Sequence, residues 1–186
     1  MKLSILAAFF YAAAAVGAEL GAAKLEERVS VGGAQLHLNG AGVRSWMLFE
    51  VYVVGLYLQK KASSAQDALA MTGPKRLAIH MLRDVASDRF SSGMLERLHA
   101  NSPEAELKAL QPRIRELTAI MHDMKQARKG STIALDWTGS AVVVSVDGKP
   151  AGKPIPGEDL YRALLRIWIG DKPGQPDLKR ALLGQK

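Results

Sequence analysis

The stretch LNGAGVRSWMLFEVYVVGLYL, Leu38–Leu58, constrains the fold more than any other part of the chain. Residues Phe49–Leu58 are apolar at both odd and even positions, which predicts a central strand covered on both faces. Arg44 stands at the head of this run, and its guanidinium needs a partner if it is buried, because it cannot lose its charge. That partner could be a carboxylate such as Glu50 or Asp136, solvent at the strand end, or the acidic head of a ligand.

Residues 1–18 have the layout of a secretory signal peptide: a basic second residue, an apolar stretch from Leu3 to Val16, and small residues at the end. Cleavage is expected after Ala18, with a position after Ala23 as the alternative. The apolar stretch is short for spanning about 30 Å of hydrocarbon, which disfavours a membrane anchor. We therefore expect a periplasmic protein with a single domain, residues 19–186, and no transmembrane anchor after signal cleavage.

Composition narrows the chemistry further. The chain contains no cysteine, so disulfides, thiolate metal sites and cysteine nucleophiles are excluded. Its net charge is +7, but the densest basic runs, Lys75–Arg76 and Lys125–Lys129, are not interleaved with aromatic residues, and we predict no nucleic-acid partner. The four histidines are isolated in sequence, so neither a metal nor another cofactor is predicted.

The order of elements predicts an α+β fold with a mainly antiparallel sheet and helices packed on it. A Ser64–Asp67 capping pattern starts a short helix, and Pro112 should kink or break a longer one. The predicted strands are 28–31, 35–38, 49–58, 76–83, 131–137, 140–148 and 149–155, and the predicted longer helices are 87–101, 105–127, 157–171 and 176–184.

Two segments resemble one protein family. GAGVR followed by an apolar strand ending in VGLYL is similar to the N-terminal signature of the chalcone isomerase fold. The segment Leu164–Gly184, LLRIWIGDKPGQPDLKRALLG, is similar to the closing helices of the same family. The resemblance implies a chalcone isomerase-like open-faced β-sandwich, and with the signal peptide it suggests the bacterial, exported branch of the family.

The resemblance also implies where a site would lie. The plant enzymes of the family close a chalcone into a flavanone with an arginine, a threonine, a tyrosine, an asparagine and a final threonine or serine. Arg44 matches the arginine, whereas Tyr52, Phe90, Arg97 and Ile167 stand at the other four positions. Because neither phenyl nor alkyl side chains donate hydrogen bonds, most of the catalytic machinery is unmatched and no catalytic residue is predicted.

Fatty-acid-binding members of this fold hold a carboxylate between the arginine and a tyrosine on the next strand, which is where Tyr52 stands. In one straight strand Arg44 and Tyr52 would be roughly 26 Å apart, so the chain must turn back between them, although RSWML contains neither glycine nor proline. The expected walls of an acyl slot are Phe49, Val51, Val53, Val54, Leu56 and Met94.

The sequence therefore favours an exported, non-enzymatic binding protein for a fatty acid or a similar small amphipathic carboxylate. Arg44, Tyr52, Phe90, Arg97 and Ile167 are the predicted ligand-binding residues. One alternative is a ligand-free protein of the cell envelope that binds a protein partner through an exposed patch. The third hypothesis is an isomerase or lyase acting on an unknown enone-type substrate.

Overall fold

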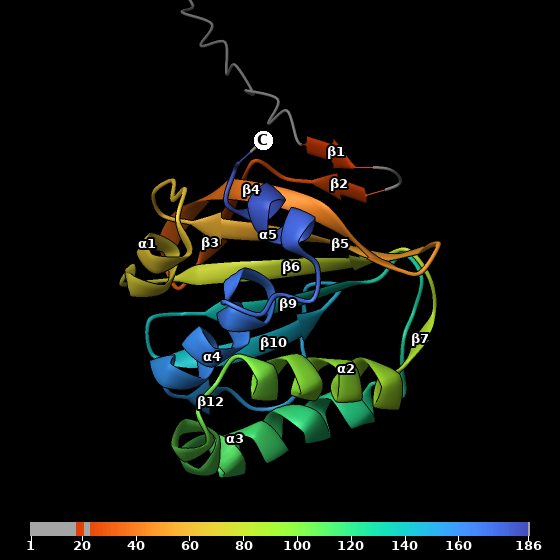
Figure 1. Cartoon of the computed structure of the whole chain (residues 1–186), viewed down its shortest axis with the longest axis vertical. Coiled ribbons are helices and arrows are strands. Elements are labelled where there is room, and N and C mark those ends of the chain that lie inside the picture. The colour runs from red at the N-terminus through yellow and green to blue at the C-terminus, as the bar shows by residue number, and fades with distance from the viewer. Residues whose placement is uncertain (1–17, 21–22, 186) are drawn as a thin grey trace, which may run out of the picture.

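The computed structural model describes residues 18–20 and 23–185. The expected signal peptide lies outside these residues except for Ala18, which begins strand β1 (Ala18–Leu20), and β1 pairs antiparallel with β2 (Ala23–Leu25). A curled antiparallel sheet carries helices on one face (Figure 1). The predicted α+β class, with a mainly antiparallel sheet and helices packed on it, is confirmed.

The main sheet is antiparallel throughout, with the strand order β3-β4-β5-β6-β9-β10-β11 and with β12 paired to β10. As predicted, β5 is central, between β4 and β6. A separate two-stranded pair, β7–β8, was not predicted from the sequence. The strand bounds are β3 Arg28–Val31, β4 Ala34–Trp46, β5 Phe49–Leu58, β6 Lys75–Met81, β7 Val85–Ala86, β8 Gln126–Ala127, β9 Thr132–Trp137, β10 Ala141–Val146, β11 Lys149–Pro150 and β12 Ile155–Pro156.

The described residues form five helices: α1 Ala65–Ala70, α2 Ser87–Ala100, α3 Glu104–Asp123, α4 Glu158–Ile169 and α5 Pro176–Leu182. The capping prediction for α1 is confirmed, because the Ser64 hydroxyl oxygen accepts the backbone N–H of Asp67 at 3.0 Å. Helix α3 is not broken at Pro112. Pro112 lies on the exposed side of α3, where water can satisfy the carbonyl that the missing N–H leaves free.

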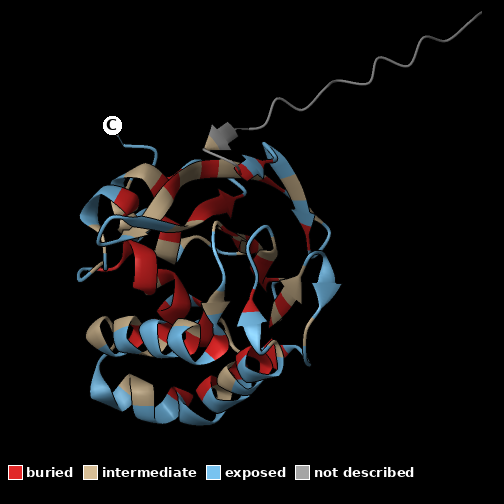
Figure 2. Cartoon of the chain, turned by 90° about the vertical axis from the view of Figure 1, so that its right-hand side faces the viewer, coloured by how far each residue is buried: buried red, intermediate tan, exposed pale blue. Residues whose placement is uncertain are grey.

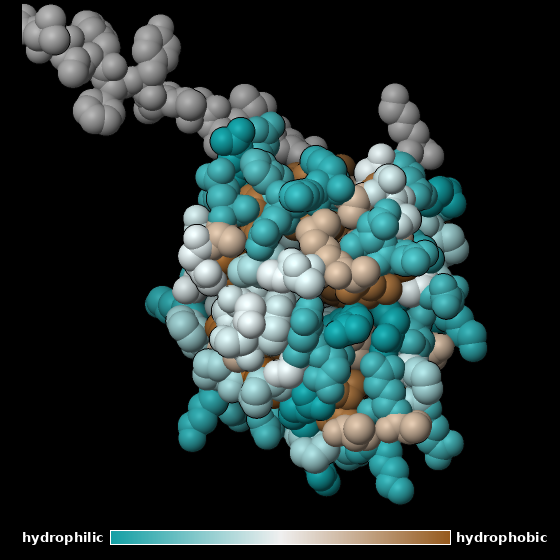
Figure 3. Space-filling view, turned by 90° about the vertical axis from the view of Figure 1, so that its left-hand side faces the viewer, coloured by the Kyte–Doolittle hydropathy of each residue, from teal (hydrophilic) through white to brown (hydrophobic). Residues whose placement is uncertain are grey.

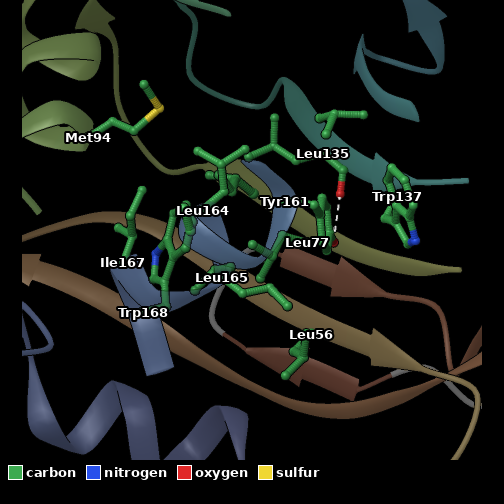
Figure 4. Packing of buried hydrophobic residues seen from close by; sticks show 14 of the residues in the cluster. Leu56, Leu77, Met94, Leu135, Trp137, Tyr161, Leu164, Leu165, Ile167 and Trp168 are labelled. Atoms are coloured by element: carbon green, nitrogen blue, oxygen red, sulfur yellow. Dashed lines mark hydrogen bonds between the residues drawn. The ribbon is translucent and has the colours of Figure 1, made fainter. Parts of the chain in front are cut away.

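Helix α4 is the centre of the main core. Eight of its residues are buried, and it contacts α1, α2, α3 and α5 as well as the sheet. Its Tyr161 hydroxyl donates to the carbonyl of Leu135 in β9 at 3.1 Å, which ties the helix to the sheet (Figure 4). The outer sides of α2 and α3 are exposed (Figure 2), so these two helices close the core from outside.

Two predicted strands differ from the structure. The strand expected to end at Leu38 continues to Trp46, because it passes Asn39 in a bulge and resumes pairing with β5 at Gly40. The single strand expected at 149–155 is instead the two short strands β11 and β12. Pro150 and Pro154 cannot donate to a ladder, and Gly152 between them has a φ of 74°, so the strand is interrupted.

The bulge residue Asn39 links strand β4 to Ala62, which follows β5, and to the last residue of helix α5. Its buried side-chain amide donates to the carbonyls of Ala62 at 2.9 Å and Leu182 at 2.7 Å, and its oxygen accepts the N–H of Ala62 at 2.8 Å. The glycines of the GAG motif, Gly40 and Gly42, face α5 closely, so the helix lies directly on β4.

Gly40→Ala should therefore destabilise the protein. An added Cβ would lie 2.1 Å from the carbonyl oxygen of Ala181 and 2.7 Å from that of Leu182, both of which are backbone atoms that cannot move alone. We expect a loss of roughly 3 kcal/mol in the free energy of unfolding, the upper end for overpacking, measured by urea denaturation.

Gly93→Ala is the control, because an added Cβ at this helical position meets nothing within 4 Å. It should raise the stability by about 0.5–1 kcal/mol through helix propensity. Equal effects of the two substitutions would contradict the close packing of α5 on β4.

Candidate ligand-binding site

The β4–β5 hairpin brings Arg44 and Tyr52 side by side. Trp46 pairs with Phe49, so the chain reverses through Met47 and Leu48 alone, and Arg44 stands directly opposite Tyr52 in the register. Met47 adopts a φ of 54°, so the turn that the sequence does not mark with glycine is made by a methionine. Cross-strand partners share a face of a sheet, so both side chains point to the helix-bearing side.

On that side lies a cavity of about 790 Å³ between the sheet and helices α2 and α4. All five residues predicted from the resemblance line it: Arg44, Tyr52, Phe90, Arg97 and Ile167. Its volume is within the roughly 300–1,000 Å³ of small-molecule sites. The structure thus brings the five together, and their contact with a ligand stays a prediction.

Arg44 is half-buried at the polar end of the cavity. Its Nη1 donates to the carbonyl of Ser45 at 2.7 Å and to Gln175 Oε1 at 3.3 Å. Arg44 forms no salt bridge in the described part of the chain, so no protein carboxylate occupies its guanidinium. Its charge and a hydrogen bond from its side chain also act on the Tyr52 hydroxyl, where they lower the pKa against the effect of burial. A guanidinium without a protein carboxylate can bind a ligand carboxylate with two parallel hydrogen bonds.

Gln175 fixes this geometry from the residue before α5. Its Oε1 also accepts the backbone N–H of Ser45 at 3.0 Å, and its Nε2 donates to the carbonyl of Val43 at 3.1 Å. The Gln175 side chain thus pairs with backbone groups of β4 at the second register shift, between Arg44 and Ser45, and also holds the arginine. Neither Glu50, which is exposed, nor Asp136 pairs with Arg44; Asp136 instead binds Arg76 through two 2.6 Å hydrogen bonds.

The hydroxyl of Tyr52 is oriented by Trp168 of α4. The indole Nε1–H, which can only donate, donates to the Tyr52 oxygen at 3.0 Å, so the phenolic O–H remains free to donate to another group. Burial raises the pKa of Tyr52 above its ordinary value of 10.0, while the Trp168 hydrogen bond and the charge of Arg44 oppose this shift. The hydroxyl therefore keeps its proton at neutral pH and acts as a donor.

A second guanidinium approaches the same end of the cavity. A Cβ added to Gly174 would lie 3.3 Å from Arg97 Cδ and 3.5 Å from Arg44 Nη2, so both arginine side chains border this glycine. Arg97 forms an ion pair with Glu96 and is partly exposed. The polar end thus combines two arginines, one tyrosine O–H and a glycine that leaves space between them, an arrangement suited to a small anion.

The rest of the lining is largely apolar. Phe90 packs edge-on against Tyr52, with ring centroids 6.4 Å apart, and side chains of α2, α4 and the sheet form the walls of the cavity. Met94 of α2 and Ile167 and Trp168 of α4 converge here (Figure 4). The other apolar lining residues are Trp46, Phe49, Val51, Ile79, Val85, Ala86, Met121, Ile133 and Leu135.

Three of the six expected slot residues do not line the cavity. Val53 faces the opposite side of the sheet, where it packs with Ala23 and Leu25, because strand side chains alternate between the faces. Val54 and Leu56 have the right parity but lie in the solid part of the core. Phe49, Val51 and Met94 do line the cavity, as predicted.

Sequence reasoning missed three contributors to the site: Trp168, Gln175 and Gly174. Nothing in the sequence around Trp168 indicates a contact with Tyr52, and only the structure shows its N–H against the Tyr52 hydroxyl. Gln175 and Gly174 lie about 130 residues from Arg44, as the separation of 131 between Arg44 and Gln175 indicates, so no local pattern connects them. The PGQP sequence before α5 was the available signal, since an ordered loop with a polar residue next to a helix start often carries a contact.

Neither a metal site nor a membrane-spanning helix is found among the described residues. No group of three or more histidine, aspartate or glutamate side chains is placed to hold a metal ion in residues 18–20 and 23–185. In the same part of the chain, no helix is both long and apolar enough to cross a bilayer.

The curled antiparallel sheet, with its helices on one face and a cavity between them, defines the chalcone isomerase-like fold. The chain belongs to the chalcone isomerase-like family, whose model matches residues 17–184. It is similar in fold to the crystal structure of a fatty-acid binding protein from Arabidopsis thaliana, with 16% sequence identity, a TM-score of 0.66, and coverage of 86% of this chain and 91% of that chain. No curated protein matches the sequence.

Tyr52→Phe should make the stability less sensitive to alkali. Below pH 10 the phenol is protonated in both states; above it the unfolded chain loses this proton while the folded protein, with its raised pKa, keeps it. As the pH rises from the unfolded pKa towards the folded pKa of Tyr52, the free energy of unfolding therefore falls by up to about 1.4 kcal/mol per pH unit. The stabilising contribution of Tyr52 is lost once the pH has passed the folded pKa.

Urea denaturation at several pH values between about 9 and 11 measures this slope for the wild type and the variant. Tyr57→Phe serves as a comparison, because its pKa is also raised, to about 12, but it lies on the other face of the sheet. An unchanged slope in Tyr52→Phe would show that Tyr52 ionises normally and is not desolvated.

Proposed function

We propose that this chain is an exported, non-enzymatic binding protein that holds a fatty acid or a similar small amphipathic carboxylate. The observation that carries the proposal is the pairing of Arg44 with Tyr52 at the polar end of the cavity. Both are donors in the protonation state that a carboxylate needs, and neither is neutralised by a protein carboxylate in the described part of the chain.

The head-group interaction follows from the donors of Arg44 and Tyr52. A carboxylate could accept two parallel bonds from Nε and Nη2 of Arg44 and a third from the Tyr52 hydroxyl, while Arg97 adds positive charge beside Gly174. Hydrogen bonds of this charge-assisted kind contribute about 1.5–3 kcal/mol each. An alcohol or a hydrocarbon would leave these donors unpaired, which supports an acid as the ligand.

The tail interaction follows from the walls. Aliphatic and thioether side chains from both the sheet and the helices line the interior, and burial of each methylene of an acyl chain contributes roughly 0.8 kcal/mol. Met94 and Met121 are flexible enough to accommodate chains of different length. The similar fold of a protein named as a fatty-acid binding protein supports the same ligand class.

Export is proposed on the sequence alone. The basic start, the apolar stretch and the small residues that close residues 1–18 support a signal peptide and a periplasmic location. A binding protein in that compartment would meet free acyl acids and membrane lipids. A cell-envelope protein partner is the alternative, and it would be favoured if the purified protein bound no acid.

A second candidate function is an isomerase or lyase acting on an enone-type substrate. The convergence of Arg44, Arg97 and the Tyr52 hydroxyl favours it, since the same donors could stabilise a developing enolate. Phe90 and Ile167 disfavour it, because they place hydrocarbon where the plant enzymes have hydroxyl-bearing donors. Incubation of the protein with a chalcone, followed by its absorbance, distinguishes the two functions: cyclisation abolished by Arg44→Met would replace the binding proposal.

Arg44→Met should weaken the binding of dodecanoic acid by roughly 100-fold, which corresponds to about 3 kcal/mol for the lost charge-assisted bonds. Tyr52→Phe should weaken it by about tenfold, since it removes one neutral donor. Isothermal titration calorimetry on the delipidated protein measures both values, and native mass spectrometry before delipidation shows which acid is carried.

Arg28→Met is the matched control, because Arg28 is exposed on β3 and loses the same charge without touching the cavity. Dodecanol is the matched ligand, since its chain is the same and its head carries no charge; Arg44→Met should leave its affinity nearly unchanged. If the wild type binds no acid, or if both ligands weaken equally in Arg44→Met, a carboxylate-binding function is excluded.

A further inference from the structure

The tip of the β4–β5 hairpin, Trp46–Phe49, exposes four consecutive large apolar side chains. Their exposed fractions are 59% for Trp46, 79% for Met47, 96% for Leu48 and 50% for Phe49, and they are the large exposed hydrophobic residues of the described chain. The tip projects from the right-hand end of the sheet in Figure 1. The opposite side of the molecule is largely hydrophilic, with scattered hydrophobic residues (Figure 3).

The turn keeps these side chains at a conformational cost. The first residue of a two-residue hairpin loop with positive φ is normally glycine, because other L-residues are strained there. Here it is Met47, with a φ of 54°, and it is followed by Leu48, almost fully exposed. Glycine or asparagine would relieve this strain, and the exposed side chains of Met47 and Leu48 do not cover the core. Their presence is therefore explained by a contact with another molecule rather than by the stability of the fold.

The tip adjoins a positively charged rim. Trp46 and Phe49 line the cavity as well as being exposed, so the tip forms part of its opening. The guanidinium of Arg83 lies over the Phe49 ring, 4.5 Å from its centroid. The charged residues lining the cavity are four arginines, at 44, 83, 89 and 97, and two carboxylates, at 84 and 96.

The arginines outnumber the carboxylates, which leaves the rim positive. Asp84 accepts the backbone N–H of Lys129 at 2.7 Å, and Glu96 pairs with Arg97. Glu50, next to the tip, adds one exposed negative charge, so the excess of arginine persists. Apolar side chains at the apex with arginines behind them match the layers of an anionic membrane surface, where acyl chains lie below phosphate groups.

The shape of the tip also favours a membrane over a protein partner. Four side chains with these exposed fractions offer roughly 600 Å², whereas a stable protein interface buries about 800 Å² on each side. A narrow projecting apex can enter a fluid layer that closes around it. Trp46 at its base is of the residue type enriched at the level of lipid head groups.

We propose that the Trp46–Phe49 tip is a membrane-docking element, which inserts Met47 and Leu48 into the outer layer of an anionic bilayer while Arg83 and Arg89 contact the lipid phosphates. Docking in this orientation directs the opening of the cavity towards the lipid. The inference goes beyond the proposed ligand, because it concerns a surface, and it holds whether or not the cavity carries an acid.

Co-sedimentation with vesicles of equal parts phosphatidylglycerol and phosphatidylcholine tests the proposal on the purified protein. The wild type should sediment with these vesicles, less with phosphatidylcholine alone, and less at high salt. Its tryptophan emission should shift to the blue, because Trp46 is exposed whereas Trp137 and Trp168 are 5% and 7% exposed. Leu48→Asp should weaken sedimentation at least about tenfold, and Leu48→Phe should restore it.

Ser140→Asp is the control, since it adds the same charge to the exposed turn between β9 and β10. This turn lies at the end of the sheet opposite to the Trp46–Phe49 tip, so the variant should sediment like the wild type. Leu48 does not line the cavity, so Leu48→Asp should keep the wild-type melting temperature and the wild-type affinity for dissolved dodecanoic acid. Failure of docking therefore remains distinguishable from failure of the binding function.

Equal sedimentation of the wild type and Leu48→Asp would overturn the proposal, and so would equal sedimentation with anionic and neutral vesicles. A wild type that is dimeric by light scattering and becomes monomeric in Leu48→Asp, without sedimenting with either vesicle, would also overturn it. In that case the tip would be an interface between two copies of the chain.

Discussion

The structure depends on holding a permanent cation beside an apolar cavity without giving it a protein carboxylate. A buried guanidinium without any partner would cost several kcal/mol, and an ion pair with a protein carboxylate would occupy its donors. The chain resolves this conflict with neutral acceptors, the Ser45 carbonyl and the Gln175 amide, which bind Arg44 without neutralising its charge. The hairpin register, the bulge in β4 and the position of α5 all serve that arrangement.

Helix α4 orients the hydroxyl of Tyr52, which lies beside Arg44. Because it is buried on nearly every side, its position is fixed by the sheet at Tyr161 and by the surrounding helices. Two turns later Trp168 meets Tyr52, so the orientation of one hydroxyl is set by the packing of a whole helix. Ile167 belongs to the same packed helix and adds an aliphatic side chain to the wall of the cavity.

Much of the fold could be predicted from the sequence because its signals are local. The period of the apolar residues identified β5 and the long helices, and the Ser64 cap identified α1. The site was predictable to the extent that Arg44 and Tyr52 belong to one hairpin. The turn between them was not, because Met47 adopts positive φ without the glycine that normally marks it. Contacts made by residues near the C-terminus could not be inferred either, since no local pattern records which strand a distant loop will meet.

The amide of Asn39 has a consequence for how the protein is assembled. Its bond to the carbonyl of Leu182 spans 143 residues, and the nearby glycines of β4, Gly40 and Gly42, face α5. The first long strand of the sheet is therefore completed by α5, a helix that is synthesised much later than the strand itself. Contacts of such long range close late in folding, because the loop entropy must be overcome before they form. During synthesis, β4 therefore cannot complete its packing until α5 has left the ribosome.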